Sequence, residues 1–251
     1  MTAGETDPTR VVLAISGEDR ETFLQGLVTN DIRKIAQGPV YAAILTPQGK
    51  YLADFLLVPG PDGTIWLDVA AVLADDLLRR LTMYRLRARV AVDRTDLKVA
   101  RGLGDLPDGA VPDPRDPALG WRIYGTQDGG PPEVDWDAIR VAYCIPETGI
   151  ELIPNETYIL EAGFERLQGV DFRKGCYVGQ EVTARMKHKT DLRKGFVTVS
   201  VDGDAGPGTL IMAHGREVGT LFTRSGDRAI AYIRHDRAEA GMTAGDATVT
   251  L

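Results

Sequence analysis

The sequence has few residues that bind metals or form disulfides. Its 251 residues include two cysteines, Cys144 and Cys176, and three scattered histidines. Two cysteines are too few for the disulfide framework of a small secreted protein. Two thiols also cannot supply the four thiolates that a protein-held iron–sulfur cluster normally needs. Because no C-x-x-C pair occurs either, we expect no resident metal.

Features typical of several other protein classes are also missing. No apolar run approaches the roughly 20 residues that cross a bilayer. The N-terminus has neither a basic start nor an apolar segment, so we expect no signal peptide. Neither common glycine-rich nucleotide fingerprint is present. The net charge of −7 argues against bulk binding of nucleic acid. We therefore expect a cytoplasmic protein without membrane or DNA partners.

The first half of the sequence shows patterns of both strands and helices. Residues 11–15 form an apolar run typical of a buried strand, and residues 41–46 and 51–58 flank a Pro-Gln-Gly-Lys turn as a hairpin. Residues 71–83 carry apolar side chains at helical spacing, which predicts an amphipathic helix. Residues 86–92 alternate apolar residues with arginine, as a half-buried strand does.

The second half begins with a loop-rich passage and ends in short apolar segments. Residues 102–132 are rich in Pro, Gly and Asp, which predicts a domain transition. We expect helices at 136–143 and 180–188 and a strand at 149–153. From residue 194 to the end, short segments rich in Val, Ile and Thr alternate with Gly and Asp turns. This spacing predicts a small β-sandwich or β-barrel.

One cysteine lies in a setting that favours reactivity. Cys176 stands between Gly175 and Gly179, directly after Arg173 and Lys174 and just before a helical pattern. Nearby cations and a helix N-terminus both stabilise a thiolate, so the pattern favours a functional thiol. From the residues alone, the alternative is a tight turn with the cysteine packed beneath it.

Two other features each allow two interpretations. Residues 173–194 carry seven Lys or Arg and two acids, a local net charge of +5. This cluster is either a landing site for a polyanion, such as a polyglutamate tail or an RNA backbone, or a solvated helix face. Asp54 stands among apolar neighbours, either on an exposed face or as a site carboxylate.

Several blocks of this chain resemble one family. Residues 174–181 match the K-G-C-Y-x-G-Q-E signature of the YgfZ family of folate-binding proteins. Residues 23–31 resemble its F-L-Q-G-x-x-T-N-D segment, residues 45–50 its L-x-P-x-G-(K/R) turn, and residues 153–156 its P-x-E segment. The family includes the mitochondrial factor for late iron–sulfur cluster assembly. It is related to the aminomethyltransferase of the glycine cleavage system.

The resemblance implies an α+β fold with three lobes. Two mixed α/β lobes and a C-terminal β-barrel form a cloverleaf around a central channel. Residues 1–45 and 103–190 are expected in the first lobe, residues 46–102 in a lobe inserted into it, and residues 191–251 in the barrel. In relatives, tetrahydrofolate binds at the centre of the cloverleaf, and the cysteine motif borders that opening.

The resemblance also implies roles for individual residues. Cys176 corresponds to the functional thiol. Binding of tetrahydrofolate, or of a one-carbon derivative, falls to polar side chains, since a pterin edge and carboxylates call for acceptors and cations. These folate-binding residues are Asn30, Asp54, Glu156, Tyr177, Gln180, Glu181 and Arg185. This chain departs from its relatives in two places: the aminomethyltransferases have paired acids where it has Ala53-Asp54, and the family has a glycine where it has Cys144.

The implied function is that of a folate-binding factor for iron–sulfur proteins. It would support the assembly or maintenance of these clients, including cluster-dependent tRNA modification enzymes, which gives an indirect link to tRNA. The alternative is a folate-dependent one-carbon transferase, against which the single Asp54 argues. A third hypothesis is a direct RNA-binding module that uses residues 173–194.

Overall fold

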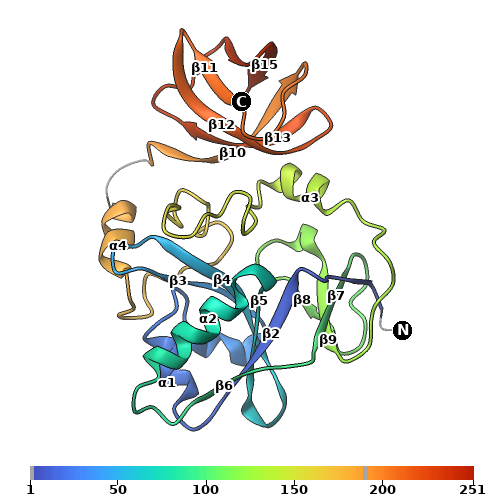
Figure 1. The fold of residues 1–251 in the computed structure, drawn as a ribbon, viewed down its shortest axis with the longest axis vertical. Helices are drawn as coiled ribbons and strands as arrows, with labels where there is room; N and C mark the ends of the chain where they lie inside the picture. The colour runs from blue at the N-terminus through green and yellow to red at the C-terminus, as the bar shows by residue number, and fades with distance from the viewer. Residues whose placement is uncertain (1–2, 189–191) are drawn as a thin grey trace. The chain divides into compact units, whose positions relative to one another are not determined.

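The computed structural model describes residues 3–188 and 192–251. The chain divides into two compact units, each treated separately below. The first comprises Met1–Val134 and Glu165–Glu181, and the second Asp135–Phe164 and Val182–Leu251. Figure 1 shows the order of the elements along the chain. Within the described ranges, no helix has the length and apolar character that crossing a membrane requires.

The first unit is built on a five-stranded antiparallel sheet. Its strands run in the order β3-β4-β5-β2-β6. They are β2 (Arg10–Ser16), β3 (Val40–Leu45), β4 (Tyr51–Pro59), β5 (Ile65–Ala70) and β6 (Ala91–Arg94). The strands predicted at 11–15, 41–46 and 51–58 are therefore confirmed. β4 is buried from Tyr51 to Val58, and a strand covered on both faces reads as an apolar run rather than an alternation.

Helices cover this sheet and complete its core. They are α1 (Arg20–Gln25), the short 3-10 helix η1 (Ile32–Gln37) and α2 (Ala71–Tyr84). Figure 1 shows α2 lying across the sheet, and its buried residues Ala74, Leu77 and Leu81 join the sheet's apolar core. The helix predicted at 71–83 is confirmed.

The strand predicted at 86–92 is wrong over most of its length. Only Ala91 and Val92 of that range pair in β6. The chain reverses direction first, through Leu86, whose φ of 46° is left-handed. The apolar–arginine alternation therefore lies in an exposed turn. Alternating side chains point to opposite faces only in a strand, and these residues are not in one.

A second sheet completes the first unit. It joins β1 (Glu5–Thr6), β7 (Lys98–Gly102), β9 (Trp121–Gly125) and β8 (Val111–Pro112), in that order, with the short 3-10 helix η3 (Pro117–Leu119) between β8 and β9. Another 3-10 helix, η2 (Pro61–Gly63), connects β4 to β5 of the first sheet. The predicted loop-rich passage thus holds one main strand, β9. The division into three lobes stays a prediction, and the hairpin of β3 and β4 spans its expected boundary at residue 45.

The second unit contains the predicted barrel. Its strands close in the order β10-β13-β12-β11-β14-β15, drawn in orange and red in Figure 1. They are β10 (Lys194–Asp202), β11 (Leu210–Ala213), β12 (Arg216–Ser225), β13 (Arg228–Arg234), β14 (Met242–Ala244) and β15 (Ala247–Thr250). The interior is apolar, with Val199, Ile211 and Leu221 at 1% exposure or less. An all-β C-terminal module is confirmed, and it is a barrel.

Two helices accompany the barrel sequence. α3 (Trp136–Tyr143) and α4 (Gln180–His188) confirm the helices predicted there, and α4 spans the division between the units. The strand predicted at 149–153 is wrong. The backbone N–H groups of residues 150, 151 and 152 all converge on the Glu147 carbonyl, at 3.2, 3.1 and 3.0 Å. This local coil leaves those donors unavailable to a sheet ladder.

Candidate functional site

Cys176 lies in an open pocket of the first unit. Its thiol is free and exposed, so the alternative of a cysteine packed beneath a turn does not describe it. The pocket has a volume of about 350 Å³. Its other lining residues come from α1, from the segment after it and from the motif loop: Glu21, Thr22, Gln25, Gly26, Ile32, Arg33 and Lys174. A molecule in this pocket can therefore reach the thiol.

Lys174 fixes the loop that presents Cys176. Its ammonium donates to the carbonyls of Gln25 (2.5 Å) and Val28 (2.7 Å), which lie at and just beyond the end of α1. A lysine at a helix C-terminus satisfies carbonyls that have no partner within the helix. Burial lowers the pKa of Lys174 to about 8, against the opposing effect of Asp31 and Asp171. The sequence pattern gives no sign that this lysine points inward.

Gln25 connects three segments around the pocket. Its amide nitrogen donates to the Lys174 carbonyl and to Asp31 Oδ1, each at 3.2 Å, and its oxygen accepts from the Ile32 N–H at 2.9 Å. Asp31 also binds the Arg33 guanidinium, at 2.6 Å for the shortest pair. These hydrogen bonds from Arg33 hold the pKa of Asp31 down to about 2. The F-L-Q-G-x-x-T-N-D block thus forms the wall beside the cysteine.

The two glycines of the motif have different reasons to be glycine. Gly175 has a φ of +100°, but a β-carbon there meets nothing within 4 Å. Gly179 has a φ of +84°, and a β-carbon there lies 2.5 Å from the Thr46 carbonyl oxygen in the hairpin turn. Gly175 therefore only needs the backbone freedom of glycine. Gly179 also permits the close approach of the loop to the hairpin.

The remaining motif residues shape the start of α4. The Tyr177 ring is 9% exposed, and its N–H donates to the Gln180 side-chain oxygen at 3.1 Å. Gln180 thereby satisfies a donor ahead of the helix. Glu181 and Arg185 are exposed on α4, and Arg185 belongs to the second unit. Their roles in folate binding stay predictions.

Asn30 is buried and fully engaged within the first unit. Its amide nitrogen donates to the carbonyls of Tyr41 (2.8 Å) and Gln168 (2.6 Å). Its oxygen accepts from the Asp31 N–H at 2.9 Å and from Lys34 at 3.0 Å. In this structure Asn30 joins the segment after α1 to β3 and to the chain ahead of the cysteine motif. Its predicted contact with folate stays a prediction.

Asp54 is a buried carboxylate, 4% exposed, on β4. It accepts hydrogen bonds from the Tyr41 and Tyr51 hydroxyls, at 3.0 and 2.7 Å. Burial and the neighbouring Asp54 raise the pKa of Tyr41 well above its ordinary value, so Tyr41 stays a donor. Of the two interpretations of Asp54, burial excludes the exposed face, and its role as a site carboxylate stays a prediction.

Asp54 lies at one end of a buried charged network that sequence reasoning missed. The Arg115 guanidinium stands 5.6 Å from the Tyr41 ring centre and binds Asp113 at 2.7 Å. Arg122 binds both Asp113 and Asp68, at 3.1 and 3.2 Å. Arg122 and Asp68 are separated by 54 residues in sequence. One sequence feature could have indicated this network: an acid such as Asp68 within an otherwise apolar strand segment.

Glu156 lies in the second unit and lines a cavity of about 200 Å³. Three aromatic rings form one side: Phe196 lies 5.4 Å from Phe222 and 5.2 Å from Tyr232 between ring centres. Tyr232 donates to Glu161 at 2.6 Å. The carboxylates and the aromatic faces thus surround one small space, which can hold a flat ring with polar edges.

Two buried residues fix the chain next to this cavity. Arg140 forms an ion pair with Glu151 at 3.0 Å, and Glu151 accepts from the Thr223 hydroxyl on β12 at 2.6 Å. Cys144 follows α3 with a φ of 50°, a left-handed conformation that favours the glycine found in the resembling family. Cys144 itself adopts this left-handed conformation.

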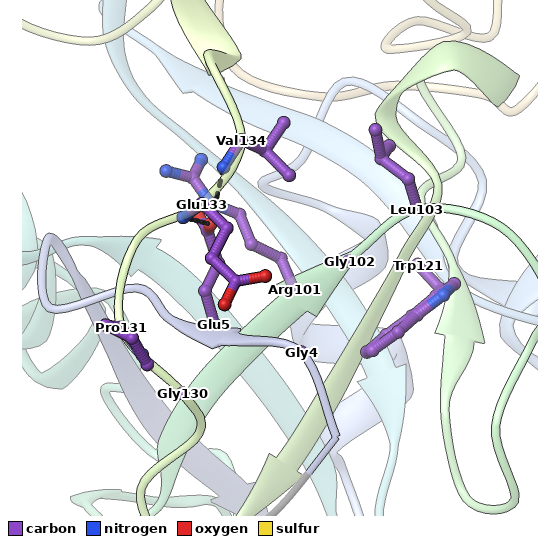
Figure 2. Close-up of a pocket in the computed structure, with 10 residues that line it drawn as sticks. All are labelled: Gly4, Glu5, Arg101, Gly102, Leu103, Trp121, Gly130, Pro131, Glu133 and Val134. Carbon is purple, nitrogen blue, oxygen red and sulfur yellow. Dashed lines mark hydrogen bonds and ion pairs between the residues drawn. The ribbon is translucent and has the colours of Figure 1, made fainter.

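A third cavity, in the first unit, contains none of the predicted site residues. Its volume is about 360 Å³. Figure 2 shows Glu5 and Arg101 on one side and the Trp121 indole on the other. The Glu5 carboxylate accepts from the N–H groups of Glu133 (2.7 Å) and Val134 (3.1 Å). It therefore holds the backbone of residues 133 and 134 in place. Among the described residues, no group of three His, Cys, Asp or Glu could hold a metal ion.

Comparison with solved structures identifies the fold. The crystal structure of glycine cleavage system aminomethyltransferase T from Bartonella henselae superposes with a TM-score of 0.77 at 14% identity, and the match covers 99% of this chain and 85% of that one. A family model described as the CAF17 C-terminal beta-barrel domain matches residues 193–251. The chain is therefore a mixed α/β protein of the aminomethyltransferase fold with a C-terminal barrel.

Curated relatives are iron–sulfur cluster assembly factors. "Iron-sulfur cluster assembly factor IBA57, mitochondrial" from Homo sapiens is 30% identical over 93% of this chain and 78% of that protein. The protein of that name from Mus musculus is 29% identical, over 90% and 76%. The IBA57 homolog from Neurospora crassa is 33% identical, but the match covers only 53% of it and 77% of this chain. The chain thus spans about half the length of that relative.

These names correct one expectation from the sequence. The relatives are named as mitochondrial, which contradicts the expected cytoplasmic location. Low cysteine content argues only against oxidising compartments, and it does not discriminate among the reducing ones. The motif resemblance to the YgfZ family points to the same group of assembly factors, although the relatives carry a different name. At 30% identity over most of both chains, the human relative shows that this chain belongs to the family of IBA57 iron–sulfur cluster assembly factors.

Proposed function

We propose that this chain supports the assembly or maintenance of iron–sulfur proteins through the Cys176 thiol, with tetrahydrofolate as its ligand. The observation that carries the proposal is the exposed thiol in a pocket, presented by a loop that the buried Lys174 and the tightly packed Gly179 hold in place. Such pre-organisation of one side chain is typical of a functional site rather than of packing.

Cys176 acts on a partner rather than on a resident cluster. One thiol supplies one ligand, whereas a held cluster needs about four. The cluster is therefore cargo carried by an iron–sulfur client or assembly protein, and Cys176 contacts that protein or its cargo. The open pocket around the exposed thiol leaves room for such a contact. Client enzymes that modify tRNA give the indirect link to tRNA.

The polar and aromatic residues of the two units support folate as the ligand. In the first unit, Asp54 is the candidate carboxylate, held by the Tyr41 and Tyr51 hydroxyls. In the second, Glu156 offers one beside three aromatic rings. The cavity around Glu156, about 200 Å³, is smaller than the roughly 300–1,000 Å³ of whole-ligand pockets, so it suits the pterin ring rather than all of folate. Bound tetrahydrofolate supplies a carrier for one-carbon groups.

The alternative functions have less support. A one-carbon transferase of the aminomethyltransferase kind is weakened because Ala53 stands beside Asp54 where those enzymes have two acids. An RNA-binding module would need the basic cluster of residues 173–194 as a free face. Lys174 in that cluster is buried, with its ammonium bound to two carbonyls. Part of the cluster, residues 189–191, lies outside the described residues.

Genetic rescue tests the role of the thiol. In cells from which the gene is deleted, we expect the activity of a [4Fe–4S] enzyme and the level of thiolated tRNA to fall. Wild type and Cys144→Ala should restore both, because Cys144 lies outside the pocket, whereas Cys176→Ala should not. Full rescue by Cys176→Ala would show that the function does not require the thiol. If deletion changes neither readout, the assembly role itself is wrong.

Calorimetric titration with tetrahydrofolate tests the ligand. Glu156→Gln and Asp54→Asn should each weaken binding by about tenfold or more, since each removes a charged acceptor worth about 1.5–3 kcal/mol. Arg216→Gln, on the barrel strand β12, is the matched control and should bind like wild type. Equal affinity in all four proteins would contradict the assignment of these carboxylates.

A further inference from the structure

The end of α2 presents an unusual group of exposed side chains. Residues 82–87 are all exposed, and they include Met83 (61% exposed), Tyr84 (37%) and Leu86 (88%). Three large apolar residues exposed within four positions are unusual, whereas single ones are ordinary. We define the α2 tip as Met83, Tyr84, Arg85, Leu86 and Arg87.

Leu86 occupies a backbone position that suits glycine. α2 ends at Tyr84, and the N–H of the capping residue Arg85 donates to the Leu81 carbonyl at 3.0 Å. Leu86 follows with a φ of 46°. The first residue beyond a helix cap is commonly a left-handed glycine, because a β-carbon is strained there. At 88% exposure the Leu86 side chain buries almost no apolar surface. Packing in the core therefore does not offset the backbone strain at this position.

Charges of both signs lie around the tip. Five arginines lie in residues 79–89 of a chain with a net charge of −7. Arg79 and Arg80 form ion pairs with Asp76, and Arg89 with Glu18 and Asp19. Arg87 forms no ion pair or hydrogen bond within the described chain. A uniformly anionic surface can match only the arginines of this region, whereas a protein surface can offer apolar contacts and match both signs.

We propose that the α2 tip is a docking surface for a partner protein that offers an apolar pocket edged with carboxylates. Leu86 enters the pocket, Met83 and Tyr84 line its rim, and Arg85 and Arg87 bind the carboxylates through their planar guanidinium groups. A central apolar anchor ringed by charge is the usual arrangement of an interface hot spot. The inference rests on the proposed function in one respect, because the partner is taken to be a protein of iron–sulfur assembly.

Rescue by tip variants of the full chain tests the proposal. We expect Leu86→Gly and Arg87→Glu to fail to restore [4Fe–4S] enzyme activity in deleted cells. Val72→Ser is the matched control, since Val72 is 77% exposed at the other end of α2, and it should rescue fully. The melting temperature of Leu86→Gly should be equal to that of wild type or up to about 4 °C higher, because glycine relieves the strain.

Cross-linking then identifies what the tip contacts. With a photoreactive amino acid in place of Leu86, the chain should join to an assembly protein in cells, and the same change at Val72 should not. The purified partner should bind Leu86→Gly about 30-fold or more weakly than wild type, the effect of losing a hot-spot residue.

Several results overturn the proposal. Full rescue by both tip variants rejects the docking surface and leaves the proposed function standing, because wild type still rescues. Absence of any deletion phenotype rejects the proposed function, and the docking proposal with it. A melting temperature of Leu86→Gly more than about 4 °C below wild type shows that Leu86 supports the fold instead. Binding of wild type to phosphatidylcholine–phosphatidylglycerol vesicles that is lost in Arg87→Glu makes the tip a membrane contact.

Discussion

The ammonium of Lys174 lies 4.9 Å from the centre of the Tyr177 ring, within the loop that presents Cys176. Both side chains point inward, at 7% and 9% exposure, while the cysteine between them is exposed. A cation over an aromatic face is stabilised most where water is excluded. The loop is thus anchored on both sides of the thiol, which fixes the thiol's position without covering it.

Loss of the Lys174 anchor should loosen this loop. Lys174→Met leaves the Gln25 and Val28 carbonyls without their donor, which should lower the free energy of unfolding by about 2 kcal/mol. Urea unfolding measures this change, and limited proteolysis should cut the motif loop sooner than in wild type. Arg216→Met, at an exposed position of β12, should change stability by less than about 0.5 kcal/mol. Equal effects of the two changes would show that Lys174 is no anchor.

The lowered pKa of Lys174 predicts how stability depends on pH. Its pKa is about 8 in the folded chain, against an ordinary value of 10.5. Between these values the unfolded chain binds the proton and the folded chain does not, so stability from this group rises with pH across the window. The free energy of unfolding is measured against pH for wild type and for Lys174→Met. The difference between the two curves isolates the contribution of the Lys174 amine. A difference that is flat between pH 8 and 10.5 contradicts the lowered pKa.

The two motif glycines should differ in their tolerance of alanine. Gly175→Ala meets open space and should cost only the backbone strain, about 1–2 kcal/mol. Gly179→Ala also forces a β-carbon to within 2.5 Å of the Thr46 carbonyl, and should cost at least about 2 kcal/mol more. Urea denaturation of both variants gives the comparison. Similar losses would mean that the hairpin moves aside freely.

Local patterns were enough to predict much of this fold. The helix at 71–83 follows from apolar periodicity, and the barrel from short β-rich segments between turns. The failures at 86–92 and 149–153 share one cause. Both segments have strand-like composition, yet a left-handed residue in each, Leu86 or Gly149, turns the chain before a ladder can form.

The candidate site was predictable only where it is local in sequence. Cys176 and its glycines could be identified because one short block contains them. The inward direction of Lys174 was not predictable, because its acceptors, Gln25 and Val28, lie 149 and 146 residues away. For Asn30 the sequence indicated a site residue, but the structure shows a side chain used within the fold. Its motif marks it as important, while the structure shows its amide occupied by Tyr41, Gln168 and Lys34.

The buried charged network of the first unit should depend strongly on Arg122. This guanidinium is held between Asp113 and Asp68, at 3.1 and 3.2 Å. Burial lowers its pKa, but the two carboxylates raise it by more, so it remains charged. Arg122→Met therefore leaves two buried carboxylates short of a partner and should cost about 3–5 kcal/mol.

A surface pair provides the matched comparison for Arg122. Arg89 binds Glu18 and Asp19 with 69% of its side chain exposed, so Arg89→Met should cost about 1 kcal/mol or less.

The stability of the buried network should also depend on pH. Burial raises the pKa of Asp113, but Arg115 and Arg122 lower it further, to below its ordinary 3.8. The stability that Asp113 contributes is thus present above pH 3.8 and is lost as the pH falls. If Arg122→Met loses no more stability than Arg89→Met, the network is not what stabilises the first unit.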